Sequence, residues 1–390
     1  MLRKKYYNNP KRLALAAIAK ETSELTLTVA ASLPRLNPTH SEKLSLETLP
    51  ALDPAKCPRF KLPDSTYGTR VRVFNQDTFD AALSMPAIVL GISSFQSKAT
   101  QAKESEILTQ LQTHASLPDQ LNATTAPRVA VLNMASEFSP GGGWLKGSTA
   151  QEEALCYRST LAASLHKNMY PMAPRTGHYT RDVVVFREGM DRGHTLLIKG
   201  KGSDGKGIPD EELPVASVLS IAGVRKPAVK GKGEVDESGS SSKTDQPAKE
   251  KNDESPAKSG ESRVKGHFKE NWKDRKGQPE GNKPKIPKGD LVFADPAVRA
   301  LTKDKMRLCL RMAASKGHTM LVLGAIGCGA FGNPPREVAA CWMEVLSERE
   351  FEGGWFKEIW FAVYDRRKEG NFEIFSEVFD GKVVGQPTTP

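Results

Sequence analysis

Cysteine is scarce in this chain of 390 residues, and its placement excludes two kinds of cross-linked domain. The five cysteines are scattered, odd in number and form no Cys-x-x-Cys pair. Disulfide frameworks and structural zinc sites both need such sets, so we expect free thiols in a reducing compartment. The seven histidines are never spaced as His-x-x-x-His, which removes a common helical metal motif. We therefore expect neither a metal nor a cofactor.

Long apolar segments are absent as well. No apolar run approaches the roughly 20 residues that a membrane-spanning helix needs, and no secretory signal is evident. Acidic residues are also in the minority, because 46 Asp and Glu against 56 Lys and Arg give a net charge of +10. This excess favours polyanionic partners such as nucleic acid, phosphates or an acidic membrane surface, unless it lies in a solvated tail.

The N-terminal segment contains no acidic side chain before Glu21, although basic residues occur from Arg3 to Lys20. Such a pattern is typical of a mitochondrial transit peptide. The alternative is a structural helix, "PKRLALAAIAKETSEL" at residues 10–25. We expect an intracellular protein in the cytoplasm, the nucleus or both, with mitochondria as the location that the first interpretation favours.

Short apolar segments alternate along the chain with amphipathic ones, which indicates strands and helices in turn. We predict strands at 69–77, 86–92, 128–136, 182–188, 194–199, 215–223, 318–326 and 357–365. We predict helices at 10–25, 79–85, 103–117, 150–167, 295–315, 335–348 and 371–379. Asp77 or Thr78 would cap the second helix. Ser148 or Thr149 would cap the helix at 150–167, where Thr149 and Glu152 would form a capping box. The alternation favours an α/β layered fold with a mostly parallel sheet.

Composition changes between residues 226 and 288. This stretch is rich in Lys, Ser, Glu, Asp, Gly and Pro, and it has few apolar residues besides Phe268 and Trp272. It cannot bury enough surface to offset its chain entropy, so we predict a disordered insertion within one domain. The predicted segments are an N-terminal helical and irregular extension that packs on the core, the first part of the domain, the insertion, the second part and a tail: residues 1–70, 71–225, 226–288, 289–380 and 381–390.

Three consecutive glycines, residues 141–143, follow a predicted strand and precede Gln151, Glu152 and Glu153 at the start of a predicted helix. The segment is not a P-loop, because GxxxxGK[ST] needs Lys directly before Ser or Thr and here Gly147 intervenes. A glutamate in the first turn of a helix is ordinarily a solvated charge that the helix dipole favours. The alternative is a carboxylate that takes part in acid–base chemistry.

A second glycine loop, "GCGAFG" at residues 327–332, also lies between a predicted strand and a predicted helix. It matches GxGxxG, but its place near the C-terminus is wrong for a dinucleotide-binding fingerprint. Glycines let backbone N–H groups approach a phosphate, and a helix starting at Pro334 or Pro335 presents its N-terminus to the same anion. A tight strand-to-helix turn is the alternative. Two such loops at the carboxyl ends of strands would hold a pyrophosphate beside a carboxylate.

Three glycines, seven further residues and then Gln-Glu-Glu together resemble the signature of poly(ADP-ribose) glycohydrolases. The "GCGAFG" segment resembles the diphosphate-binding loop of that family. The N-terminal helix, "LNMAS" before "PGGG", and "VVVFRE" are most similar to the microbial-type branch, which includes fungal members. The resemblance covers most of the chain apart from the Lys-rich insertion and parts of the N-terminal arm. It implies a macrodomain fold, a three-layer sandwich with a mixed, mostly parallel sheet between helices.

The resemblance also implies an activity, which is hydrolysis of the ribose–ribose O-glycosidic bonds of poly(ADP-ribose) with release of ADP-ribose. Glu153 matches the catalytic glutamate, and Glu152 matches the neighbour that holds the hydroxyls of the ribose under attack. Phe331 would pack over the distal ribose, and Tyr364 is our candidate for stacking on adenine, with ordinary packing as its alternative. The implied substrate site comprises Gln151, Glu152, Asn133, Ser136, Gly141, Gly142, Gly143, Gly327, Cys328, Gly329, Ala330, Phe331, Gly332 and Tyr364.

The sequence departs from the family pattern at two places. Macrodomains often carry Asn-x-Ala-Asn after the strand, whereas this chain has Asn133-Met-Ala-Ser136, and serine has the shorter reach. Many relatives continue a later strand into an Ala-Pro-Asn-like turn, whereas this chain has "IAGVRKP" before the insertion. The resemblance therefore leaves that side of the pocket unassigned.

Glycosidases normally use two carboxylates several ångströms apart, but neighbours on a helix point about 100° apart. Our hypothesis is that Glu153 acts alone, first as the acid that protonates the departing ribose hydroxyl and then as the base for water, through an oxocarbenium-like ion. The alternatives are a hydrolase of single ADP-ribose units, a non-catalytic ADP-ribose reader, and a nucleic-acid-associated protein that uses the basic insertion. We expect a monomer whose partners are poly(ADP-ribose), ADP-ribosylated proteins and the product ADP-ribose, with neither membrane binding nor a need for nucleic acid.

Overall fold

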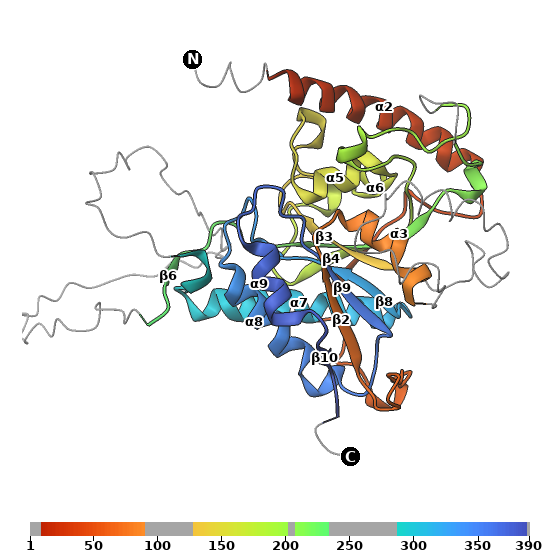
Figure 1. Cartoon of the computed structure of the whole chain (residues 1–390). Coiled ribbons are helices and arrows are strands. Elements are labelled where there is room, and N and C mark those ends of the chain that lie inside the picture. The colour runs from red at the N-terminus through yellow and green to blue at the C-terminus, as the bar shows by residue number, and fades with distance from the viewer. Residues whose placement is uncertain (1–8, 90–127, 202–206, 234–286, 388–390) are drawn as a thin grey trace, which may run out of the picture.

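The computed structural model describes residues 9–89, 128–201, 207–233 and 287–387 (Figure 1). The helix predicted at 103–117 lies outside these ranges, as do residues 90–92 of one predicted strand. Most of the predicted disordered insertion also lies outside them, as do the basic residues that precede Asn9. Among the helices in the described ranges, none has both the length and the apolar character to cross a membrane.

The core of the molecule is an eight-stranded mixed sheet. Its strands, in spatial order, are β1 (Glu42–Ser45), β4 (Thr176–Val184), β5 (Val215–Ala222), β3 (Ala130–Ala135), β8 (Met320–Leu323), β9 (Glu358–Ala362), β2 (Thr69–Phe74) and β10 (Val383–Val384). The five strands from β5 to β2 run parallel to one another, and antiparallel strands flank them on both sides. The prediction of a mostly parallel sheet is confirmed.

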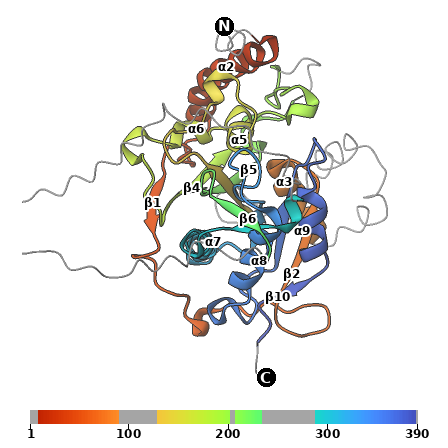
Figure 2. The ribbon, with the colours of Figure 1, turned by 90° about the vertical axis from the view of Figure 1, so that its left-hand side faces the viewer.

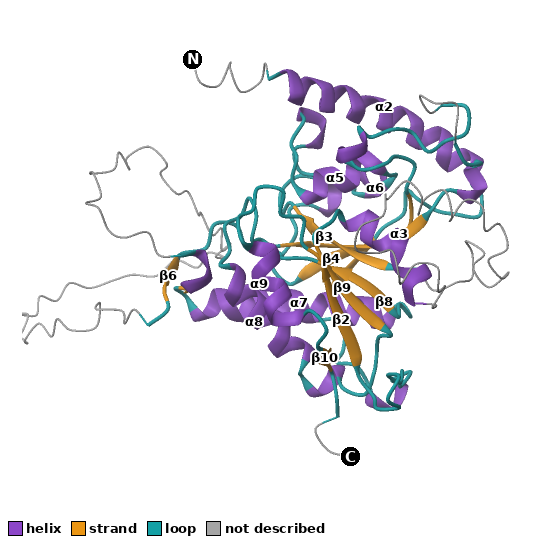
Figure 3. Ribbon diagram, viewed as in Figure 1, coloured by secondary structure: helices purple, strands orange, loops and turns teal. Residues whose placement is uncertain are grey.

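Helices cover both faces of this sheet (Figure 1, Figure 2). One layer holds α2 (Pro10–Ser32), α3 (Thr78–Val89), α5 (Gln151–Arg158) and α6 (Leu161–Ser164). The other layer holds α7 (Pro296–Ser315), α8 (Pro335–Leu346) and α9 (Asn371–Phe379), and Figure 3 shows the strands between the two layers. Alternation along β3 explains this arrangement, because Ala130 and Leu132 pack with α7 and α8 whereas Val131 packs with α3 and α5. The predicted three-layer sandwich is confirmed.

Most predicted elements form where the local sequence signals place them. The carboxylate of Asp77 accepts a hydrogen bond from the backbone N–H of Phe79 (2.9 Å), as a cap of α3 should. Pro335 opens α8, with Pro334 at the N-cap. The helix predicted at 10–25 is also present, although it continues to Ser32.

The helix predicted at 150–167 is wrong in two respects. It breaks after Arg158, because Ser159 is extended and forms an isolated antiparallel bridge with Val185. Its N-cap is Ala150, which makes no side-chain cap bond, so neither Ser148 nor Thr149 caps it. No capping box forms, and the carboxylate that it would need bonds elsewhere in the candidate site.

Two predicted strands are wrong. Residues 86–89 form the last turn of α3, because a short apolar run fits a buried helix as well as a strand and the helix continues through Pro86. Residues 194–199 form only isolated bridges. Their apolar side chains, including that of Ile198, pack against α2 and Phe186 in a small satellite core, and that packing produces the strand-like pattern.

Two ordered segments contradict the irregular regions of the prediction. Strand β1 lies within the stretch 1–70 that was predicted to be irregular after its helix, and it pairs with β4. At the start of the predicted insertion, β6 (Val229–Gly231) pairs antiparallel with β7 (Leu291–Phe293). The prediction that disorder begins at residue 226 is therefore wrong for residues 226–233. Pairing with a distant segment supplies the order that composition alone does not indicate.

Candidate active site

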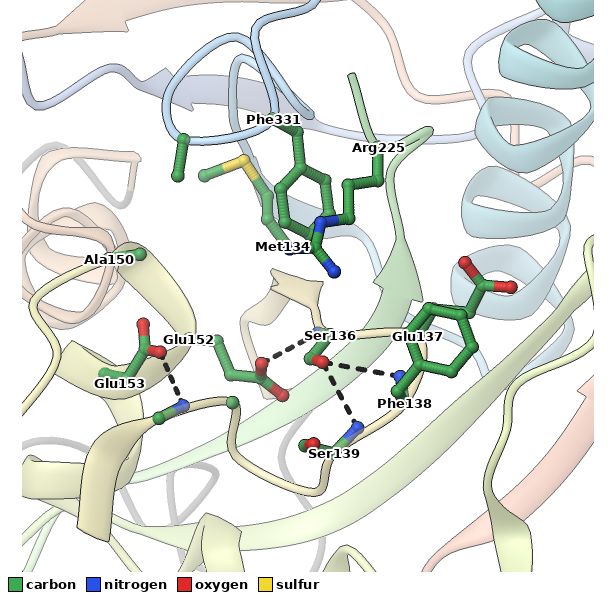
Figure 4. A pocket seen from close by; sticks show the side chains of 13 residues that line it. Met134, Ser136, Glu137, Phe138, Ser139, Ala150, Glu152, Glu153, Arg225 and Phe331 are labelled. Carbon is green, nitrogen blue, oxygen red and sulfur yellow. Dashed lines mark hydrogen bonds between the residues drawn. The ribbon is translucent and has the colours of Figure 1, made fainter. Parts of the chain in front are cut away.

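A cavity of about 230 Å³ opens at the carboxyl ends of β3, β5 and β8 (Figure 4). Its walls come from the segment after β3, the start of α5, the segment after β5 and the second glycine loop. The lining residues are Met134, Ser136, Glu137, Phe138, Ser139, Gly142, Gly143, Ala150, Glu152, Glu153, Arg225, Ala330 and Phe331. Both glycine loops thus meet at one cavity, as predicted from their places after strands.

The glycine triplet allows the backbone to lie against two carboxyl groups. Gly141 and Gly142 have φ of +67° and +61°, a left-handed conformation that favours glycine. A methyl group on Gly142 would lie 2.5 Å from Oε1 of Glu153 and 3.0 Å from Oε2 of Glu152. At Gly143 it would lie 2.3 Å from Oγ of Ser148. A larger residue at Gly142 would displace both glutamates, whereas one at Gly143 would displace Ser148.

Both glutamates are buried, and each is held by one backbone N–H. Glu153 is 7% exposed, and its Oε1 accepts a hydrogen bond from Gly143 N (2.7 Å). Glu152 is 3% exposed, and its Oε2 accepts one from Ser136 N (2.7 Å). Oε1 of Glu152 and Oε2 of Glu153 make no hydrogen bond to the residues that the structure describes. Each glutamate therefore has one oxygen fixed by a backbone N–H and one that makes no hydrogen bond to the described residues.

Burial has a direct consequence for the charge on Glu152. Loss of hydration raises its pKa to about 8, the hydrogen bond from Ser136 N–H lowers it by less, and the negative charge of Glu153 adds to the rise. Glu152 is consequently protonated near neutral pH, so its carboxyl group can both donate and accept hydrogen bonds.

This raised pKa predicts a pH-dependent stability. The folded protein keeps a proton on Glu152 up to about pH 8, whereas the unfolded chain loses it near 4.5, the ordinary pKa of a glutamate side chain. Stability is therefore complete below the lower value and falls as pH rises through the higher one. In Glu152→Gln the group cannot ionise. The free energy of unfolding of the variant minus that of wild type should therefore increase by about 2–4 kcal/mol from about pH 5 to about pH 9. Urea denaturation across this range measures the gain, and a constant difference between the two proteins would contradict it.

Gln151 and Asn133, two of the predicted site residues, lie outside the cavity lining. The amide of Gln151 accepts from Met134 N (2.8 Å) and donates to Leu132 O (2.7 Å), which ties the start of α5 to the end of β3. Asn133 is fully buried, and its Nδ2 donates to Oγ of Ser220 on β5 (3.0 Å). Both side chains position the strand and helix ends that carry the cavity.

Ser136, another of the predicted site residues, lies in the cavity wall. Its Oγ accepts hydrogen bonds from the backbone N–H groups of Phe138 (3.4 Å) and Ser139 (3.2 Å), so it shapes the turn that leads to the glycine triplet. The side chain of Phe138 is 59% exposed at the rim.

The second glycine loop is folded around Asn333. A methyl group on Gly327, whose φ is +76°, would lie 2.4 Å from Nδ2 of Asn333. That amide donates to Val224 O (2.6 Å) and to Gly327 O (3.1 Å), so it joins the loop to the segment after β5. Of the six predicted loop residues, Ala330 and Phe331 line the cavity.

The exposed part of this loop presents free backbone donors. Cys328 is buried, whereas Gly329, Ala330 and Gly332 are exposed. Within the described ranges, the N–H groups of Gly329, Ala330 and Phe331 donate no hydrogen bond. Consecutive free N–H groups form a site for an anion.

Helix α2 contacts the turn that links the glycine triplet to the glutamates. Nη2 of Arg12 donates to Lys146 O (2.9 Å) and to Oγ of Ser148 (3.2 Å). Gly147, with φ of +72°, lies so close to α2 that a methyl group there would be 2.1 Å from Arg12 O. The N-terminal helix therefore buttresses the carboxylate-bearing end of α5.

Tyr364 and Arg225 mark the limits of the sequence prediction. Tyr364 is not part of the cavity lining, and its hydroxyl donates to the carboxylate of Asp191. Its stacking on adenine remains a prediction. Arg225 lines the cavity but was not predicted, although it stands in the "IAGVRKP" segment noted as a departure.

In the described part of the chain, no cluster of His, Cys, Asp and Glu could hold a metal ion.

Part of the chain matches a known family model. Residues 54–188, which include the glycine triplet and both glutamates, match the family model of the microbial-type PARG catalytic domain. No curated protein matches the sequence.

Solved structures that share the fold include two from one organism. Poly(ADP-ribose) glycohydrolase from Thermomonospora curvata bound to the inhibitor ADP-HPD is 20% identical, with a TM-score of 0.51 over 94% of this chain and 100% of that one. A further structure of poly(ADP-ribose) glycohydrolase (PARG) from the same organism is 21% identical, with a TM-score of 0.51 over 94% and 99% of the two chains.

Proposed function

We propose, from the match of residues 54–188 to the family model of the microbial-type PARG catalytic domain, that the protein hydrolyses poly(ADP-ribose) to ADP-ribose. The observation that carries this proposal is the pair of buried glutamates beside Gly142, in a cavity shared with the second glycine loop. A protein that only bound ADP-ribose would have no need of two buried carboxyl groups, because burying them costs free energy.

In the proposed reaction, Glu153 supplies the acid and then the base. Gly143 N–H fixes Oε1, so Oε2 is the atom that transfers protons. Protonated Oε2 donates to the ribose oxygen that leaves as the O-glycosidic bond breaks. An oxocarbenium-like ion forms at the distal ribose, and the resulting carboxylate then takes a proton from the attacking water.

Glu152 holds the ribose under attack in this scheme. Its Oε2 is fixed by Ser136 N–H, and its Oε1 faces no partner among the described residues. Since its pKa is raised to about 8 by burial, it can exchange hydrogen bonds in both directions with vicinal hydroxyls at neutral pH.

The loop at residues 327–332 cradles the substrate diphosphate. The free N–H groups of Gly329, Ala330 and Phe331 point to an anion there, and the glycines leave room for close approach. The ring of Phe331 faces the cavity (Figure 4), and in this proposal it packs on the distal ribose.

Digestion of purified poly(ADP-ribose) tests the proposal. We expect the wild-type protein to release free ADP-ribose, measured by liquid chromatography of the products. A parallel digest of protein bearing single ADP-ribose units separates the two hydrolase activities. Release from the single units alone would replace the proposal by a mono-ADP-ribosyl hydrolase, and binding without any release would indicate a reader.

A further inference from the structure

One basic side chain lines a cavity that is otherwise acidic. The described lining includes three carboxyl groups, from Glu137, Glu152 and Glu153, and a single cationic group, from Arg225. A nucleoside diphosphate carries adjacent negative charges, and carboxyl groups supply no positive charge to balance them. The cavity thus needs a positive group if such a ligand is to bind, and Arg225 is the one that its described lining supplies.

The backbone around Arg225 is tied to the second glycine loop. Val224 O accepts from Nδ2 of Asn333 (2.6 Å), and Lys226 N donates to Phe331 O (2.8 Å). Lys226 also has φ of +47°, a left-handed conformation that is costly for a residue with a side chain. These constraints hold Arg225 beside the free N–H groups of the loop.

The side chain of Arg225 remains available. It is exposed and makes no hydrogen bond or ion pair with the residues that the structure describes. Figure 4 shows its guanidinium directed toward the cavity, on a different side from Glu152 and Glu153. A cation held at an anion-binding loop, yet kept from neighbouring carboxylates, is suited to an anionic ligand.

We infer that Arg225 binds the diphosphate of an ADP-ribose unit and completes the site that the loop at 327–332 begins. The planar guanidinium matches two phosphate oxygens at once, whereas backbone N–H groups alone provide no full positive charge. This inference rests on the proposed function for its ligand. It also assigns a role to the "IAGVRKP" segment, where the chain departs from the pattern of its relatives.

The test compares Arg225→Gln with Lys226→Gln. Both variants remove one positive charge from the same segment, but Lys226 does not line the cavity. Calorimetric titration with ADP-ribose should give a Kd about 10–100-fold higher for Arg225→Gln than for wild type, as expected for loss of a charged hydrogen-bond pair. The Kd of Lys226→Gln should stay within several-fold of wild type, and Arg225→Lys should recover part of the affinity.

Two further readouts separate ligand binding from a structural role. Between about 50 mM and about 300 mM NaCl, ADP-ribose affinity should fall less steeply for Arg225→Gln than for wild type, because one charge contact is gone. In poly(ADP-ribose) digests, KM should rise while kcat stays within several-fold, since the diphosphate lies away from the bond that breaks.

Failure of this inference is distinct from failure of the proposed function. If wild type binds ADP-ribose but releases none from polymer, the activity is wrong and the titrations still decide the role of Arg225. Equal Kd values for Arg225→Gln and Lys226→Gln overturn the inference even if hydrolysis is intact. Absence of measurable ADP-ribose binding by wild type overturns it as well.

Discussion

Glu153→Gln is expected to lower kcat for poly(ADP-ribose) hydrolysis by about 10²–10⁴-fold, the usual contribution of a positioned acid–base group. The amide oxygen can still accept the hydrogen bond that Gly143 N donates to Oε1 (2.7 Å), so the loop and the helix start keep their geometry. The amide cannot donate and then recover a proton at the position of Oε2. ADP-ribose affinity should stay within several-fold of wild type, and product release together with calorimetry measures both quantities.

Glu137→Gln is the matched control for this variant. Its carboxyl group lines the same cavity, and it has no part in the proposed chemistry. Its kcat should remain within several-fold of wild type. Undiminished turnover by Glu153→Gln would remove Glu153 from the catalytic role, and an equal loss in both variants would mean that general cavity charge, and not a proton donor, sets the rate.

The sequence predicted the parts of the site that depend on local chain geometry. Glycines after one strand and glutamates at the next helix start had to lie at the same sheet edge, because parallel strands end together. That reasoning brought Gly142, Glu153 and Phe331 to one cavity without knowledge of the fold.

Long-range partners explain what the sequence could not predict. The capping box failed because Glu152 bonds to Ser136 N–H on a neighbouring segment, a choice that spacing within the helix does not indicate. Gln151 likewise turns its amide to β3 instead of the cavity. Asn333 and Arg225 belong to segments joined only by the folded sheet order β5-β3-β8, so neither carried a recognisable motif.

A long-range contact also explains why the predicted end of one helix was wrong. The helix predicted at 150–167 ends at Arg158, whose guanidinium is almost fully buried and pairs with Asp77 and Asp80 of the α3 start. A buried ion pair of this kind anchors the chain in place, so the following residue, Ser159, can turn into the sheet. The hydrophobic periodicity of the sequence does not indicate a long-range ion pair of this kind.

Gly142→Ala is expected to abolish most activity with a moderate loss of stability. The added methyl group would lie 2.5 Å from Oε1 of Glu153 and 3.0 Å from Oε2 of Glu152, so both carboxyl groups must move. A displacement of that order costs about 10²-fold in rate when it misplaces the reacting group. The φ of +61° adds about 1–2 kcal/mol of backbone strain for alanine. Steady-state kinetics and urea denaturation measure the two effects separately.

Gly317→Ala separates the contact from the strain. Gly317 has φ of +77°, nothing lies within 4 Å of an added methyl group, and it precedes β8 at the sheet edge opposite the cavity. It should lose about 1–2 kcal/mol of stability from the same backbone strain while its kcat stays at the wild-type value. If the two variants lost activity in parallel, the loss in Gly142→Ala would follow from reduced stability. If only Gly142→Ala lost activity, the loss would come from the contact of the added Cβ with the carboxyl groups. The space that glycine leaves at that position would then be what allows both glutamates to keep their active geometry.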